Sequence, residues 1–294
     1  MEQIIANGLY LGAQYALIAL GLTLIFSLMN VLNFAHGQMY VFGGFVTYTV
    51  VVQFGLPFIV GLLASAVILA IMGAAIEKFL FAPVVRRSKR DESTMLLAAG
   101  VAFFLDAVIL LLFGEKQRGV PKVVNGVFNW DMRIIMPYDR ILIGVLAILL
   151  IVVFIAFMNY SRTGRAMRAL AQDKMAAQLM GVNVARYSMI GFALGAMLAG
   201  LVGGLLVTIT GVNLGMGGPT SIKAFLMIMI GGAGVISGAI AGGFILGMME
   251  SVGLTVLSAY GDITYLVIFA SAIILAIMGA AIEKFLFAPV VRRS

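Results

Sequence analysis

Between Gln3 and Ile76 the chain contains no aspartate, glutamate, lysine or arginine. The surface of a water-soluble domain needs charged residues, so this tract cannot belong to one. A membrane-spanning helix needs about 20 mainly apolar residues, and the tract therefore has room for two long spans with a shorter segment between them. The rest of the chain is similar, because 63% of all residues are hydrophobic and only 11% are charged.

Further apolar segments follow this tract. The uncharged run 141–158 is too long for a strand of a membrane barrel and therefore indicates helices, which satisfy their own backbone hydrogen bonds in lipid. The candidate spans are 93–113, 138–159, 187–212, 219–233, 236–256 and 262–282. Together with the first tract they predict an all-α fold, a polytopic transmembrane helical bundle with eight or nine membrane segments, some of them short or broken. Residues 1–294 are expected to form a single domain.

The basic residues indicate the orientation of the bundle, because loops on the cytoplasmic side carry an excess of lysine and arginine. They cluster at Lys78, Arg86, Arg87, Lys89 and Arg90, at Arg162, Arg165, Arg168, Lys174 and Arg186, and at Lys284, Arg292 and Arg293. These three regions are expected inside and the 114–140 loop outside. The N-terminus is then outside with nine segments and inside with eight. This topology explains the net charge of +7 without a nucleic-acid partner.

The composition leaves few groups for chemistry. The chain has no cysteine and one histidine, so disulfides, thiolate catalysis and clusters of histidine around a metal are excluded. We expect no enzyme activity, no metal site and no bound cofactor. The first apolar stretch, residues 4–28, is too long for the core of a cleavable signal peptide and lacks a basic start, so it is expected to remain as a span.

A basic, helix-forming stretch, residues 162–186, separates two apolar segments. At helical spacing its apolar residues can gather on one side, with Arg165 and Arg168 at the edges and Asp173 as its one acid. The apolar residues are Met167, Leu170, Met175, Leu179 and Met180. The pattern predicts a short helix that lies against another surface, which is either a partner protein or the anionic lipid of the membrane.

Two polar features interrupt the apolar segments. The first is a group of four uncharged hydrogen-bonding residues, which are costly in hydrocarbon unless they face protein, water or a solute. These are Asn30, Asn33, His36 and Gln38. The second is a pair of acids, Asp106 within a span and Glu250 near the end of another. We expect Asp106 to pair with a polar group of another helix, and we count both acids and the four polar residues as candidates for a solute pathway.

Glycines crowd the segment 229–247, MIGGAGVISGAIAGGFILG, and include the pair Gly231 and Gly232. Small residues allow helices to pack closely and glycine pairs allow a helix to break. Because this charge-free stretch contributes to two segments, the cluster predicts a break. A helix broken at mid-membrane commonly presents backbone polar groups to a solute, so Gly231 and Gly232 are also pathway candidates.

Four regions, in chain order, closely resemble the permease subunits of branched-chain amino-acid ABC importers. They are NFAHGQ followed by GGF, the loop TGRAMRALAQDKMAAQLMGVN, the run GGAGVISGAIAGG, and the acid Glu250 after it. The resemblance implies that the loop is a coupling segment that docks on an ATPase. Its matching positions are Arg165, Arg168, Asp173, Ala176, Ala177 and Gly181, with Met175 in the place of the family's glutamate.

The resemblance implies a multi-pass permease of the bacterial cytoplasmic membrane that works by alternating access on branched-chain or related hydrophobic amino acids. Its implied partners are membrane lipid, a second permease (a paralogue rather than a second copy), an external solute-binding protein and two cytoplasmic ATPases. ATP is then hydrolysed by those partners, in keeping with the absence of a GxxxxGK[ST] motif from this chain.

Three alternatives remain. The same kind of importer can serve urea, short amides or other small polar solutes. A stand-alone ion-coupled transporter or channel is the second alternative. The absence of a paired intramembrane acid and base and the presence of the docking-helix pattern at residues 162–186 both argue against it. A membrane-bound enzyme is the third and lacks a nucleophile, a base and metal ligands.

One segment departs from the family pattern. Residues 65–88 recur as residues 271–294, and the two copies differ only by Val67 and Ile273. An ancient repeat would have diverged throughout, so we interpret the second copy as a recent or artificial replacement. It keeps an apolar span with a basic end.

Overall fold

The structure is a computed structural model that describes residues 1–87, 91–130 and 134–258. The span expected at 262–282 and the near-copy 271–294 lie outside these residues. Seven helices within them are long and apolar enough to cross a membrane. A short helix is also present between the first two, as expected, so the prediction of a polytopic helical bundle with short segments is confirmed.

The elements of the first half follow one another with few loops. They are α1 (Glu2–Met29), α2 (His36–Tyr48) with its π-helical continuation Thr49–Gln53, α3 (Phe58–Ile76), the π-helix Glu77–Phe81, α4 (Ala82–Arg87) and α5 (Asp91–Phe113). The second half begins with a hairpin of two short antiparallel strands, which the sequence did not predict. Its elements are β1 (Val127–Trp130), β2 (Ile134–Pro137), α6 (Tyr138–Tyr160), α7 (Arg162–Gln172), α8 (Lys174–Leu179), α9 (Val184–Leu206), the 3-10 helix Leu214–Met216, α10 (Gly217–Gly231) and α11 (Ile236–Ser258).

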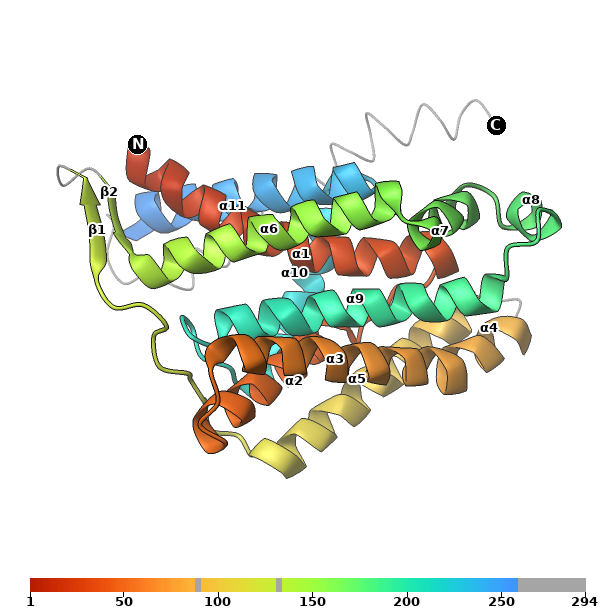
Figure 1. Cartoon of the computed structure of the whole chain (residues 1–294), viewed down its shortest axis with the longest axis horizontal. Helices are drawn as coiled ribbons and strands as arrows, with labels where there is room; N and C mark the ends of the chain where they lie inside the picture. The colour runs from red at the N-terminus through yellow and green to blue at the C-terminus, as the bar shows by residue number, and fades with distance from the viewer. Residues whose placement is uncertain (88–90, 131–133, 259–294) are drawn as a thin grey trace.

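Helix α1 lies in the interior of the bundle and packs against α6, α9 and α11, while α9 packs against α2 and α3 (Figure 1). The interface between α1 and α11 is the most extensive among the described elements. Glycines make it close, because a Cβ atom built on Gly243 would lie 2.4 Å from the backbone nitrogen of Ala16. By contrast, α5 and α6 leave most of their apolar surface exposed, which suits contact with lipid or another subunit.

The bundle has two distinct ends. The N-terminus and the β1–β2 hairpin lie at one end, and α4, α7 and α8 lie at the other (Figure 1). Gln3 joins the two parts of the first end, since its Oε1 accepts a hydrogen bond of 2.7 Å from the backbone nitrogen of Ile135. This arrangement agrees with the nine-segment topology, in which the N-terminus and the 114–140 loop share the outer side. We call these the outer end and the inner end.

Two span boundaries were predicted wrongly. The span expected at 187–212 begins earlier, because Asn183 caps α9 by accepting a hydrogen bond from the nitrogen of Arg186, and it ends at Leu206. The span expected at 219–233 is α10. It begins two residues earlier than expected, at Gly217, because the 3-10 helix Leu214–Met216 leads directly into it. It ends at Gly231 because Gly232 has a φ of 91°, which leaves the helical region.

The orientation can be tested by labelling cysteines in the naturally cysteine-free chain. We expect Lys174→Cys, at the inner end, to be protected from an impermeant thiol reagent added to intact cells, and Asn125→Cys, at the outer end, to react. Permeabilised cells give the control, since both variants should then react. Labelling of Lys174→Cys alone in intact cells would invert the topology.

Candidate functional site

A cavity of about 470 Å³ lies in the outer half of the bundle, between α1, α2, α10 and α11. The loop that joins α9 to α10 contributes Asn213, Gly215 and Met216 to its wall. Arg118 and Val212 pair backbone to backbone and connect this loop to the outer segment after α5. The cavity therefore lies near the side from which a solute would arrive in the proposed topology.

An ion pair faces this cavity. Lys223 of α10 lies with its Nζ 2.9 Å from both carboxylate oxygens of Glu250 of α11, and it donates a hydrogen bond of 2.7 Å to the hydroxyl of Tyr15. The Tyr15 hydroxyl in turn donates to Glu250 Oε2. The side chains of Lys223 and Glu250 are 39% and 23% exposed, so water or a solute in the cavity can reach them.

This pair corrects the sequence analysis. One of the two arguments against an ion-coupled transporter is the absence of a paired intramembrane acid and base, and Lys223 with Glu250 is such a pair. Glu250 was identified as a candidate, but Lys223 was missed. The available signal was that Lys223 is the one charged residue in the predicted span 219–233, and a lone charge within a span usually has a partner and a function.

Three of the four predicted polar residues organise the turn between α1 and α2. Asn30 ends α1 in the left-handed conformation, with a φ of 56°, and Asn33 Oδ1 accepts a hydrogen bond from the nitrogen of Ala35. His36 is fully buried, and its Nε2 lies 3.1 Å from the carbonyl oxygen of Ile18. A carbonyl can only accept, so Nε2 carries the proton and the ring ties α2 to α1.

The same turn also holds α10. The hydroxyl of Ser221 donates to the carbonyl of Phe34 and accepts from the nitrogen of Gly37, both at 2.9 Å. Ser221 lies two residues before Lys223, so the NFAHGQ motif positions the helix that carries the ion pair. The backbone of the motif thus holds the helix that carries Lys223, and His36 itself does not line the cavity described above.

Gln38 and Asp106 are brought together, as expected for an acid within a span. Gln38 Nε2, on α2, donates to Asp106 Oδ2, on α5, across 3.4 Å. Gln38 Oε1 and Asp106 Oδ1 are both buried without a hydrogen-bond partner among the described residues. This contact crosses between two helices and is separate from the ion pair.

The predicted glycine break is a complete turn between α10 and α11. Gly231 and Gly238 face each other so closely that a Cβ on Gly231 would fall 1.9 Å from the Gly238 carbonyl oxygen. The predicted break is therefore confirmed as a turn between two segments, and it lies near Ser27 at the inner end of α1. Gly234 and Val235 of this turn line a cavity together with Arg168 and Gln172 of α7, and Gly231 and Gly232 do not line the cavity that the ion pair faces.

The segment 162–186 forms two helices and not one. Asp173 separates them, with a φ of −152°, and its Oδ1 accepts hydrogen bonds from the nitrogens of Met175 and Ala176. Arg165 and Arg168 donate to the last turn of α6, through the carbonyl of Tyr160 and the side-chain oxygen of Asn159. These contacts attach α7 to the bundle.

The break at Asp173 redirects the apolar residues, so the expectation that they gather on one side is wrong. Met167 and Leu170 of α7 are buried against the bundle, and Ala177 is the buried residue of α8. The side chains that α8 and its end present outward are highly exposed: Met175 is 74%, Leu179 84% and Met180 85% exposed. Gly181 follows in the left-handed region, with a φ of 85°.

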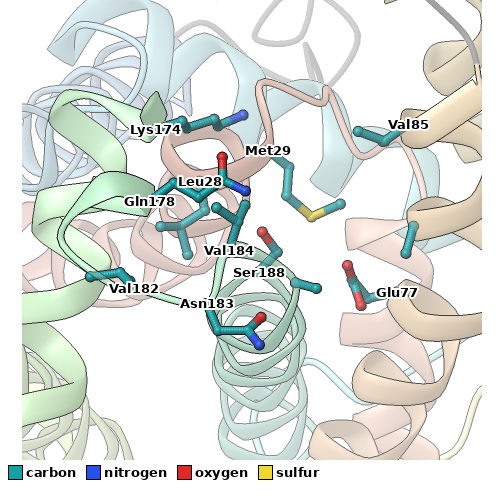
Figure 2. Close-up of a pocket in the computed structure, with 13 residues that line it drawn as sticks. Leu28, Met29, Glu77, Val85, Lys174, Gln178, Val182, Asn183, Val184 and Ser188 are labelled. Carbon is teal, nitrogen blue, oxygen red and sulfur yellow. The ribbon is translucent and has the colours of Figure 1, made fainter. Parts of the chain in front are cut away.

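A second cavity, of about 690 Å³, lies beneath α8 at the inner end (Figure 2). Lys174 and Gln178 of α8 lie on one side of it, Met29 at the end of α1 lies between, and Glu77 and Val85 lie on the far side (Figure 2). Helix α8 is thus attached through its two ends and a buried Ala177, with open space between it and the helices around α4.

His36 provides a test of whether the first polar group lines a pathway or stabilises the fold. We expect His36→Leu to lower the melting temperature in detergent, because it removes the hydrogen bond that ties α2 to the Ile18 carbonyl of α1, a loss of about 0.5–1.5 kcal/mol. Uptake per folded complex should stay within about twofold of wild type. A large loss of uptake with an unchanged melting temperature would place His36 on the pathway.

The chain is similar to known permeases over most of its length. The profile of the family described as "Branched-chain amino acid transport system / permease component" matches residues 4–278. The high-affinity branched-chain amino acid transport system permease protein LivH of Salmonella typhimurium is 34% identical over 273 residues, which cover 87% of each chain. The corresponding BraD protein of Pseudomonas aeruginosa is 32% identical over 88% of this chain and 87% of its own.

A solved structure agrees with the fold. PsaBC from Streptococcus pneumoniae, determined in complex with Fab, aligns with a TM-score of 0.51 and 14% identity over 94% of this chain and 90% of its own. That identity is low, so the likeness concerns the fold alone. The family profile and the two relatives carry the assignment: the chain belongs to the family of permease components of branched-chain amino acid transport systems.

Proposed function

We propose that the protein is a membrane-spanning subunit of an ATP-driven importer and translocates branched-chain or related hydrophobic amino acids across the bacterial cytoplasmic membrane. The observation that carries this proposal is the family match over residues 4–278. The protein's own task is to expose a pathway first to one side and then to the other. No covalent step is required of it, and ATP is hydrolysed by partner subunits.

Helices α7 and α8 are the proposed connection to two cytoplasmic ATPases. Three exposed apolar side chains on α8 support this assignment, because an exposed apolar group at the end of a membrane protein suits a groove on a partner. The attachment of α7 to α6 through Arg165 and Arg168 gives a route by which movement of α8 reaches the spans. In the lipid-anchoring alternative the arginine side chains would contact lipid headgroups. Arg165 and Arg168 instead donate hydrogen bonds to the last turn of α6.

A second permease, a paralogue rather than a second copy, is proposed to pack against the exposed apolar faces of this chain. An external solute-binding protein would deliver the solute to the outer end. The cavity that contains Lys223 and Glu250 is the proposed start of the pathway, since it lies in the outer half and offers polar groups within the membrane.

An experiment can distinguish this proposal from two alternatives, an ion-coupled transporter and an importer of urea or short amides. The Lys223–Glu250 pair favours an ion-coupled transporter more than the sequence suggested, because paired intramembrane charges serve ion movement in such proteins. The family match favours the ATP-driven importer. Urea or short amides remain the alternative solutes for the same machinery.

The test is reconstitution of the complex, with the second permease, the ATPases and the binding protein of its source, into proteoliposomes. We expect uptake of labelled leucine, isoleucine or valine that requires ATP and persists when ionophores collapse ion gradients. Uptake that needs a gradient and no ATPase would establish the ion-coupled alternative. Uptake of urea in preference to leucine would change the solute.

A further inference from the structure

We infer that Lys223, Glu250 and Gln14 recognise the charged head of an amino acid, with Lys223 and Gln14 facing its α-carboxylate and Glu250 its α-ammonium. This inference rests on the proposed function and names the site at which that function selects its solute.

The first argument is chemical complementarity. Lys223 and Glu250 together carry no net charge, and the head of an amino acid carries one positive and one negative charge. A zwitterion can exchange partners with the pair without leaving any charge unpaired, because its carboxylate replaces that of Glu250 at Lys223 and its ammonium replaces Lys223 at Glu250. A solute with a single charge would leave one unpaired charge in a membrane-embedded cavity, which is costly.

The second argument is an unused donor in the same cavity. Gln14 lines the cavity from α1, and its side chain is 1% exposed. Its Nε2 is buried and makes no hydrogen bond of 3.5 Å or less among the described residues, and the side chain that interacts with it is Tyr10, whose hydroxyl is also unpaired. Buried donors are nearly always satisfied in native proteins, so this one indicates a group that arrives from outside the chain. An amide donor in the same cavity as a lysine suits a carboxylate.

The third argument is an apolar part of the wall, which lies beside polar residues such as Tyr40, Thr210 and Asn213. Leu11, Ile18, Leu206 and Met216 line the cavity that the ion pair faces. The volume of about 470 Å³ falls in the range of small-molecule sites. A charged head at the pair and an aliphatic side chain against these residues would use both kinds of surface.

The ion pair is not needed to hold its helices together. Helices α10 and α11 already meet backbone to backbone, because a Cβ on Gly242 would lie 2.2 Å from the carbonyl oxygen of Met227.

A smaller cavity of about 170 Å³, lined by Asn7 and Arg140, shares Leu11 and Gln14 with the first and extends towards the outer end. The pair thus lies where an incoming solute would meet it.

The test uses the whole reconstituted complex and the double variant Lys223→Met with Glu250→Leu, which removes both charges and leaves neither unpaired. We expect at least a tenfold loss of leucine uptake per folded complex, with a melting temperature like that of wild type. A merely structural pair predicts uptake within twofold of wild type, and that result would overturn the inference. Lys122→Met, which removes an exposed cation at the outer end, is the matched control and should leave uptake unchanged.

A second variant keeps the test decisive if the double variant does not fold. Gln14→Leu removes a buried amide whose donor is unpaired, so it should preserve or raise the melting temperature. Recognition predicts that it raises the KM for leucine at least fivefold with little change in maximal rate, and an unchanged KM would overturn the role of Gln14. A wild-type complex that transports no branched-chain amino acid would instead refute the proposed function, which these variants do not test.

Discussion

A complex that carries Gly181→Asp is expected to insert and assemble normally but to lose at least nine tenths of its ATP-dependent uptake. Gly181 has a φ of 85°, and no atom lies within 4 Å of the position of an added Cβ. Aspartate tolerates this left-handed conformation better than most residues, so the cost to folding should be about 1–2 kcal/mol or less. The new carboxylate would lie beside Leu179 and Met180, on the surface proposed to enter the ATPase groove.

Gly114 supplies a matched control for this change. It also has a positive φ, of 75°, and open space around the position of its Cβ, but it follows α5 at the opposite end of the bundle. Gly114→Asp should therefore retain uptake and stimulated ATPase activity close to wild type. Uptake per assembled complex, together with copurification of the ATPase, gives the measurement. Normal coupling in Gly181→Asp would remove α8 from the docking surface.

The long spans could be predicted from the sequence because their limits follow from hydrophobic length. The expected span 93–113 coincides with the membrane-compatible part of α5, and 138–159 ends one residue before α6 does. The limits of α9 and α10 were missed because local hydrogen bonds and dihedral angles set them, through the cap at Asn183 and the positive φ of Gly232.

The candidate site was less predictable, since it depends on contacts between distant parts of the chain. Glu250 and Lys223 are 27 residues apart and meet because α10 and α11 form a tight hairpin, and Tyr15 joins them from α1. Periodicity within one helix carries no information on such contacts. The prediction of one helix in the segment 162–186 was wrong for a different reason. It treated Asp173 as part of that helix, whereas the Asp173 side chain caps the start of α8.

Gly243→Leu is expected to prevent folding almost completely. A Cβ at this position of α11 would lie 2.4 Å from the nitrogen and 2.5 Å from the Cα of Ala16 on α1, so backbone would have to move. Overpacking of a core usually costs about 1–3 kcal/mol when side chains can adjust, and here no side chain can. We expect less than a tenth of the wild-type yield of monodisperse protein after extraction in mild detergent.

Gly100→Leu is the control, because Gly100 lies inside the apolar helix α5 and no atom lies within 4 Å of the position of its Cβ. Leucine favours helix more than glycine by about 0.8–1 kcal/mol, so this variant should be as stable as wild type or more stable. The two changes add the same side chain to the same kind of helix and differ only in what surrounds it. A normal yield of Gly243→Leu would therefore mean that α1 and α11 do not meet through their backbones, and the position of Tyr15 beside Glu250 would have to be revised with that interface.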